Sequence, residues 1–253
     1  MKPIALHGKA LPMPAVCVPF VGRTAGALRA EAARAARLKP DLVEWRVDFF
    51  EGIARTADVV ALAQELRNAA GVPLLFTRRS SREGGQPIAL GEPEVVALYE
   101  AVCAARAADI VDAEMAGDRA HVQAVREAAR AAGIALLLSF HDFAGTPPAG
   151  ELLARFRQAQ DLGADIGKLA VMPQSKADVL ALLQATLQAS ETLDIPVAGM
   201  AMGALGAASR LCGGEFGSAL TFGMGEAASA PGQMPVDALR AGLAVLREAS
   251  ARR

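Results

Sequence analysis

Short apolar runs alternate with longer segments rich in Ala, Leu, Arg and Glu along almost the whole chain. The runs have the length of single buried strands, and the longer segments repeat their apolar residues with the period of a helix. Such alternation favours parallel strands joined by helices. The predicted strands are Ala15–Val21, Leu42–Val47, Pro73–Arg79, Asp109–Met115, Ile134–His141, Asp165–Val171, Pro196–Met200 and Phe216–Phe222. Eight such units predict an α/β fold of the (βα)8 TIM barrel type.

The length of 253 residues suits one closed barrel, so we expect a single domain over residues 1–253. Thr24, Asp118 and Ser175 stand where helix N-caps are expected, before the helices 25–38, 119–132 and 176–193. A doubly wound sheet is the rival fold. It would need a glycine-rich phosphate loop after the first strand, and the segment 21–24 lacks that pattern.

Composition excludes several classes of function. The formal net charge is −1 and the basic residues are scattered among acids, so we expect no nucleic acid partner. The 3 cysteines form no CxxC pair, which favours a reducing compartment and argues against disulfides or a cysteine-rich zinc site. No apolar run approaches the roughly 20 residues of a membrane span. We therefore expect a cytoplasmic protein.

Lys168 lies inside the predicted strand Asp165–Val171, whereas the other lysines lie in a terminus, a turn or a helix start. Burial disfavours the charged form of an amine, so such a lysine needs a partner or serves chemistry. A free amine on an apolar strand is a candidate for Schiff-base formation. The alternative is a lysine whose stem packs in the core while its ammonium extends past the strand end to water.

Polar residues share one face of several predicted strands. Alternate side chains of a barrel strand face the lumen and the helices. In the second strand Val43 and Trp45 form the apolar face, which places Glu44 and Arg46 on the other. By the same alternation, the polar residues expected to meet in the lumen are Glu44, Arg46, Arg79, His141 and Lys168. Barrel active sites lie where strands end, so this set predicts one.

His141 is the natural proton carrier beside an imine-forming lysine, because its pKa lies near neutrality. A carboxylate would fix its tautomer, and both Asp142 and Glu83 are candidates. Two alternatives remain open, a purely structural histidine and a metal ligand. Metal binding is disfavoured because no second histidine falls at ligand spacing and a divalent cation would repel the ammonium of Lys168.

Motifs along the chain resemble those of the type I 3-dehydroquinate dehydratases, in the same order. They are Glu44-Trp45-Arg46-Val47-Asp48, Thr77-Arg78-Arg79 with Glu83-Gly84-Gly85, His141-Asp142-Phe143, Lys168-Leu169-Ala170, Met200-Ala201-Met202-Gly203 with Ser209-Arg210, and Ser229-Ala230-Pro231-Gly232-Gln233. The resemblance implies a barrel, usually a homodimer, that needs no metal or organic cofactor. The implied reaction converts the small molecule 3-dehydroquinate to 3-dehydroshikimate in the shikimate pathway of aromatic amino acid biosynthesis.

The resemblance also implies residue roles. Lys168 forms an imine with the C3 carbonyl, His141 moves the protons, and Glu83 orients His141. Arg210 clamps the substrate carboxylate as a bidentate partner. The remaining implied contacts are ring hydroxyls at Glu44, Arg46 and Arg79, an apolar wall of Met200, Met202 and Phe222, and a closing loop with Ser229 and Gln233. Ordinary barrel packing is the alternative for the methionines. Two arginines beside Lys168 are expected to favour its free amine.

Two other functions fit parts of the sequence. A class I aldolase would need a phosphate site, which the glycine-rich segments 203–206 and 212–214 offer at a helix start. Arg210 and Gln233 suit a carboxylate and hydroxyls better. A catalytically inactive barrel that senses a metabolite would not need Lys168, His141 and Glu83 together.

Overall fold

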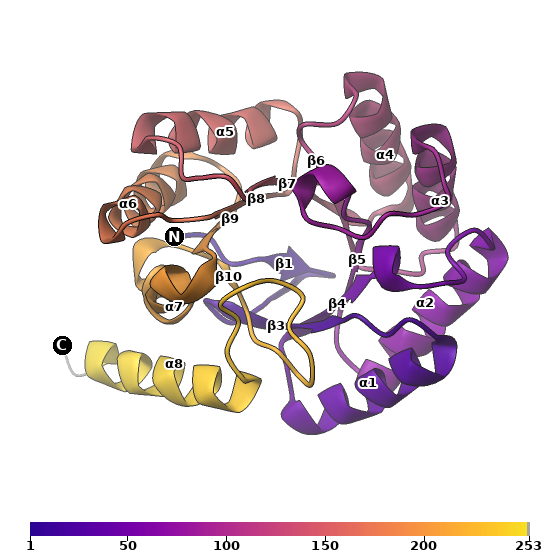
Figure 1. Cartoon of the computed structure of the whole chain (residues 1–253), viewed down its shortest axis with the longest axis horizontal. Coiled ribbons are helices and arrows are strands. Elements are labelled where there is room, and N and C mark those ends of the chain that lie inside the picture. The colour runs from indigo at the N-terminus through magenta and orange to yellow at the C-terminus, as the bar shows by residue number, and fades with distance from the viewer. Residues whose placement is uncertain (252–253) are drawn as a thin grey trace.

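The computed structural model, which describes residues 1–251, forms an 8-stranded parallel barrel. Strands alternate with helices along the chain, and the helices surround the ring (Figure 1). The barrel strands are β3 (Ala15–Phe20), β4 (Leu42–Arg46), β5 (Leu74–Thr77), β6 (Ile110–Glu114), β7 (Ala135–Asp142), β8 (Ile166–Val171), β9 (Val197–Ala201) and β10 (Leu220–Phe222). Their order in the sheet is β10-β3-β4-β5-β6-β7-β8-β9. The predicted (βα)8 class is confirmed.

One helix follows each barrel strand. The helices are α1 (Ala25–Leu38), α2 (Thr56–Ala70), α3 (Glu92–Ala104), α4 (Arg119–Ala132), α5 (Ala149–Asp161), α6 (Lys176–Thr192), α7 (Gly203–Cys212) and α8 (Val236–Ala251). The three predicted N-caps are confirmed, because the side chains of Thr24, Asp118 and Ser175 each accept a hydrogen bond from a backbone N–H of the first turn. Short 3-10 turns lie at Val47–Phe49, Ser81–Glu83 and Gly213–Phe216.

Two predicted strand limits differ from the structure by more than one residue. The third strand ends at Thr77, because the N–H groups of Arg78 and Arg79 donate to side chains instead of to a neighbouring strand. The eighth begins at Leu220, because residues 213–216 form a 3-10 turn that ends at Gly217 with a φ of 88°. That left-handed conformation suits glycine and interrupts an extended strand. The barrel closes between β9 and β10 through a single parallel bridge, Val197 to Ser218.

The barrel separates two apolar layers. Val43, Trp45 and Leu169 belong to the layer between strands and helices. Leu75 and Leu137 belong to the smaller layer inside the lumen. The predicted alternation of faces is therefore confirmed, and it directs the polar residues between those apolar ones into the barrel interior.

An N-terminal hairpin closes the barrel end opposite to the pocket. It consists of β1 (Ala5–Leu6) and β2 (Lys9–Ala10), which the sequence analysis does not predict (Figure 1). Ile4 and Leu6 are 1% and 7% exposed and pack with the lumen layer. Since apolar side chains fill this end of the lumen, the polar residues lie toward the carboxyl ends of the strands.

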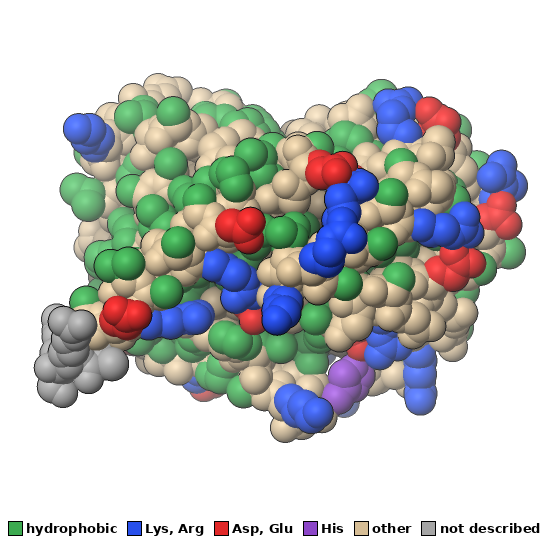
Figure 2. All heavy atoms as spheres, turned by 90° about the horizontal axis from the view of Figure 1, so that it is seen from below, with side chains coloured by type: hydrophobic (Ala, Val, Ile, Leu, Met, Phe, Trp, Pro, Cys, Tyr) green, Lys and Arg blue, Asp and Glu red, His purple; other side chains and the backbone are tan. Residues whose placement is uncertain are grey.

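Acidic and basic side chains are interspersed on the face shown in Figure 2. No single-sign patch covers that face, in keeping with the formal net charge of −1. Within residues 1–251, no helix has the length and apolar character needed to cross a membrane.

Candidate active site

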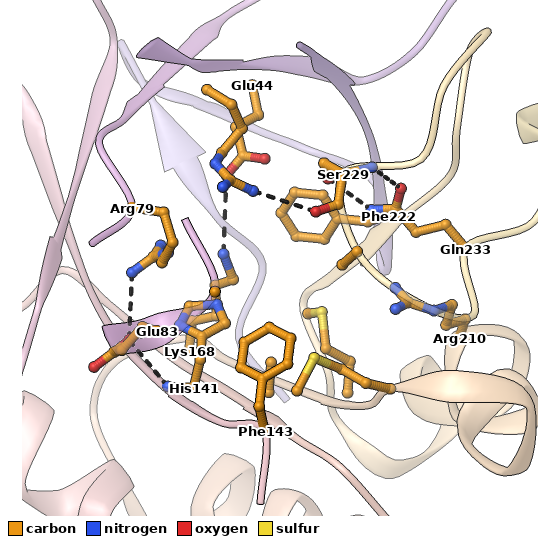
Figure 3. Close-up of a pocket in the computed structure, with 16 residues that line it drawn as sticks. Glu44, Arg79, Glu83, His141, Phe143, Lys168, Arg210, Phe222, Ser229 and Gln233 are labelled. Carbon is orange, nitrogen blue, oxygen red and sulfur yellow. Dashed lines mark hydrogen bonds and ion pairs between the residues drawn. The ribbon is translucent and has the colours of Figure 1, made fainter. Parts of the chain in front are cut away.

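A pocket opens at the carboxyl ends of the barrel strands (Figure 3). It is lined by Glu44, Arg46, Arg79, Glu83, Gly84, His141, Phe143, Lys168, Ala170, Met200, Met202, Arg210, Phe222, Ser229, Ala230 and Gln233. Every residue that the sequence analysis predicts for the site is in this set. The barrel brings them together from strands and loops that are far apart in the chain.

Lys168 lies on β8 and is 4% exposed, so its ammonium does not extend to water. Its Nζ is 3.3 Å from Oδ2 of Asp112 and 3.9 Å from Oε1 of Glu44. The same atom lies 4.8 Å from the centroid of the Phe222 ring. The amine is therefore surrounded by two carboxylates and the negative face of an aromatic ring.

The two arginines expected beside Lys168 are each held by a carboxylate. Arg46 donates from Nε and Nη2 to the two oxygens of Asp48, at 2.9 and 2.8 Å. Arg79 donates from Nη2 to Oδ2 of Asp112 at 2.6 Å. The carboxylates of Asp48 and Asp112 thus offset the positive charge of the two arginines near the Lys168 amine. The sequence pattern predicts the arginines but not these partners.

Arg79 is the centre of a buried network. Besides Asp112, its Nη1 atom contacts Oγ of Ser139 at 2.8 Å, Glu114 at 3.2 Å and Glu83 at 3.5 Å. Burial lowers the pKa of Arg79, but the surrounding carboxylates outweigh burial and raise it above its usual value. Arg79 is thus a permanent cation that ties β6 and β7 to the turn Ser81–Glu83.

Asp112 and Glu114 are absent from the residues predicted for the site. A signal for both was present, since along β6 they alternate with Val111 and Ala113, which face the helices. The alternation applied to the other strands would have placed them with Lys168.

Glu83 is the carboxylate that holds His141. Its Oε2 atom lies 2.8 Å from Nδ1 of the ring and accepts the backbone N–H of His141 at 3.1 Å. Asp142, the other candidate, accepts the N–H groups of Ala144 and Gly145 instead. Because Nδ1 is occupied by Glu83, Nε2 is the ring nitrogen left to exchange protons with a ligand.

Burial governs the charge of this pair. Burial, followed by the cations Arg79, Lys168 and Arg46, lowers the pKa of His141 well below its usual value. Burial, followed by Glu114, raises the pKa of Glu83 to about 8. The imidazole is therefore neutral near pH 7, which is the state that accepts a proton.

Arg210 lies on α7 and is 2% exposed. One of its nitrogens, Nη2, donates to the carbonyl of Pro231 at 3.0 Å. Nε and Nη1 are buried and find no hydrogen-bond partner within residues 1–251. Burial lowers the pKa of Arg210 to about 10, so the guanidinium stays charged at neutral pH. A buried cation with two unused donors is suited to a planar anion such as a carboxylate.

The loop between β10 and α8 covers the mouth of the pocket (Figure 1, Figure 3). Its own contacts join Ser229 to Gln233 through two hydrogen bonds of 2.9 and 3.0 Å. Arg46 donates to the carbonyl of Ser229 at 3.4 Å, and Arg210 holds Pro231 as described above. The loop is therefore fastened by arginines that line the pocket.

Another part of the pocket wall is apolar. Met200, Met202 and Phe222 are 5%, 1% and 3% exposed and belong to the lumen layer. Phe143 also lines the pocket and is 39% exposed, whereas those three side chains are buried. Phe143 follows His141-Asp142 in the sequence and is not among the residues predicted for the site. Among the described residues, no group of 3 or more His, Cys, Asp and Glu side chains is arranged to hold a metal ion.

The model of the type I 3-dehydroquinase family matches residues 16–250. The 3-dehydroquinate dehydratase of Albidiferax ferrireducens is 50% identical over 252 residues, which cover 98% of this chain and 96% of the relative. The crystal structure of 3-dehydroquinate dehydratase from Geobacillus kaustophilus superposes with a TM-score of 0.94 at 48% identity, covering 98% of this chain and 97% of that one.

A second solved structure is similarly close in fold. The type I 3-dehydroquinate dehydratase of Clostridium difficile, determined with covalent modified comenic acid, has a TM-score of 0.93 at 35% identity and covers 98% of this chain and 99% of that one. The family match spans nearly all of the barrel described above, including every residue of the pocket. The chain therefore belongs to the type I 3-dehydroquinase family.

Proposed function

We propose that this protein dehydrates 3-dehydroquinate to 3-dehydroshikimate and water, through an imine on Lys168, in the shikimate pathway. The observation that carries the proposal is one pocket holding a buried lysine, a neutral histidine held by Glu83, and an arginine with unused donors. Membership of the family supports the same reaction.

The first chemical stage joins substrate and enzyme. Nζ of Lys168, as the free amine, adds to the C3 carbonyl and forms a carbinolamine. Protonation of the carbinolamine hydroxyl releases water and leaves a positively charged iminium. His141 lines the same pocket and carries the protons of these steps through Nε2.

The second stage eliminates water from the ring. The iminium withdraws electrons, so His141 can remove the proton at C2 and leave a neutral enamine. The enamine electrons then expel the C1 hydroxyl, which takes up a proton and leaves as water. A conjugated iminium results. Addition of water to this iminium releases 3-dehydroshikimate and regenerates the amine of Lys168.

The remaining pocket residues bind and orient the substrate. The guanidinium of Arg210 donates hydrogen bonds to the substrate carboxylate through its unused N–H groups. Glu44, Arg46 and Arg79 face the ring hydroxyls from the strand ends. Ser229 and Gln233 close the pocket from the loop, and Met200, Met202 and Phe222 exclude water from the other side.

The aldolase alternative has less support. Its phosphate site would use backbone N–H groups at the start of α7, but the N–H of Gly203 there already donates to the carbonyl of Pro231 at 3.2 Å.

We further propose that the protein acts in the cytoplasm as a homodimer of single-domain barrels. The family resemblance supports this assembly.

Borohydride reduction in the presence of 3-dehydroquinate tests the proposal. We expect one reduced ligand mass on the intact protein, located on the peptide that carries Lys168. Formation of 3-dehydroshikimate, followed by its ultraviolet absorbance, should be lost in Lys168→Ala. Lys176→Ala is the matched control, since Lys176 is an exposed residue at the start of α6. Turnover without any adduct, or an adduct on another lysine, would contradict the imine mechanism.

A further inference from the structure

Asp112 is fully buried beneath the pocket and is not part of its lining. Its Oδ1 atom accepts a hydrogen bond of 2.6 Å from Ser139. Its Oδ2 atom is shared by Arg79 at 2.6 Å and by Nζ of Lys168 at 3.3 Å. A substrate in the pocket is therefore separated from Asp112 by side chains that line the pocket, among them Lys168 and Arg79.

The charge of Asp112 is kept in the folded protein. Burial raises the pKa of its carboxyl, but Arg79, Lys168 and the hydrogen bond from Ser139 outweigh burial and lower it below its usual value. The carboxylate is thus a fixed negative charge in contact with the nitrogen that reacts. Arg79 alone does not neutralise it, because Arg79 is shared with Glu114 at 3.2 Å.

The chemistry proposed above needs a negative charge at this place. The Lys168 nitrogen is neutral as the attacking amine and as the enamine, and it is positive in both iminium states. The iminium states drive the C2 deprotonation and the final hydrolysis. In a buried site, a positive nitrogen without a partner is costly, so its population depends on a nearby counterion.

We propose that Asp112 is the counterion that keeps the Lys168 imine protonated through the catalytic cycle. The proposal rests on the imine mechanism and adds to it a catalytic residue that touches the reacting nitrogen. The ring of Phe222 contributes on another side of the nitrogen, at 4.8 Å from its centroid.

Glu44 is the competing counterion and is less well placed. Its nearest oxygen is 3.9 Å from Nζ, against 3.3 Å for Asp112, and the same oxygen accepts the hydroxyl of Thr77 at 2.9 Å. Glu44 also lines the pocket, so a bound substrate competes for it. Asp112 has no such competition.

Asp112→Asn removes the charge and keeps the shape and most hydrogen-bond partners of the side chain. We expect kcat to fall by about 10²-fold with KM nearly unchanged, because the lost interaction acts on charged intermediates and not on substrate binding. The product imine, formed by adding 3-dehydroshikimate, should absorb at shorter wavelength than in the wild type, because an unprotonated conjugated imine absorbs to the blue of its iminium. Asp48→Asn is the matched control. It removes the charge of an equally buried carboxylate, the one that forms an ion pair with Arg46. The absorption band of the imine should stay at its wild-type wavelength.

A measurement on the wild type decides the proposal even if Asp112→Asn does not fold. The C=N stretch of a protonated imine moves to lower frequency when water is replaced by D₂O, and that of a neutral imine does not. We expect the shift in the wild type and in Glu44→Gln. No shift in the wild type, or its loss in Glu44→Gln, would overturn the assignment of Asp112. An unchanged band and rate in folded Asp112→Asn would do the same.

The two proposals fail in different ways. If the wild type turns over without any borohydride-trapped adduct, the imine mechanism itself is wrong. If the adduct forms on Lys168 but is unprotonated, or stays protonated without Asp112, only the counterion role is wrong.

Discussion

Oε2 of Glu83 contacts His141 twice, at 2.8 Å from the ring Nδ1 and at 3.1 Å from the backbone N–H. The two contacts fix both the position and the rotation of the imidazole. Nε2, the other ring nitrogen, consequently faces the pocket. The arrangement is that of a proton carrier with an orienting carboxylate.

Replacement of the proton carrier should trap the covalent intermediate. In His141→Ala, we expect the imine to form slowly while elimination and hydrolysis stall, so that adduct accumulates without reductant and is seen by intact mass. Loss of general acid–base assistance should reduce kcat by about 10²–10⁴-fold. Lys168→Ala should show no adduct and less residual turnover. A His141→Ala variant with near wild-type turnover would show that the base lies elsewhere.

Glu83→Gln should reduce kcat less than His141→Ala does. The glutamine still contacts the ring but cannot take the charged form that Glu83 takes as the pH rises past about 8, and that form raises the basicity of the ring. Steady-state rates of the two variants, measured at the same pH, check this order. If Glu83→Gln is the more damaging variant, Glu83 acts directly on the substrate and is not only an orienting group.

The raised pKa of Glu83 also predicts a dependence of stability on pH. Its pKa is about 8 in the folded protein and 4.5 ordinarily, so the folded state holds the proton more tightly. Stability from this group is therefore complete below about pH 4.5 and is lost as the pH rises toward 8, by an amount on the order of 4 kcal/mol. Urea unfolding should show Glu83→Gln gaining stability relative to the wild type across this range. The exposed Glu51→Gln should parallel the wild type, and a pH-independent difference for Glu83→Gln would contradict the shift.

Arg210→Ala should weaken substrate binding more than chemistry. Removing a bidentate partner of a carboxylate should cost about 2–4 kcal/mol, mostly shared by the ground and transition states, so KM should rise more than kcat falls. Arg210→Lys should recover little, because a lysine lacks the planar fork. Full recovery by lysine would mean that the site requires only a positive charge.

Gly232→Ala should open the loop over the pocket. Gly232 has a φ of 78°, and a Cβ there would collide with the carbonyl oxygen of Gly203. Because the loop is fastened to Arg210 and Arg46, its displacement should raise KM while the unfolding temperature changes little. Gly150→Ala, at an unobstructed position in α5, is the control. A KM equal to that of the wild type would show that this loop does not contact the substrate.

The sequence alone determined the barrel and the side chains that point into it. The alternation of strand and helix is a local property, and so is the parity that sets Glu44 and Lys168 opposite to Trp45 and Leu169. Local signals also located the helix starts. They failed at the eighth strand, where the glycines at 213, 214 and 217 form a turn.

Only the tertiary structure decided which charged groups meet. Lys168 and Asp112 are 56 positions apart, and their contact depends on the register of β6, β7 and β8, which pair Asp112 with Leu137 and Ser139 with Lys168. The choice of Glu83 over Asp142 as the partner of His141 likewise depends on a turn after β5 that folds back over the pocket. Sequence periodicity gives the direction of each side chain. The distances between charges follow from packing across the barrel, and those distances set the protonation states on which the chemistry depends.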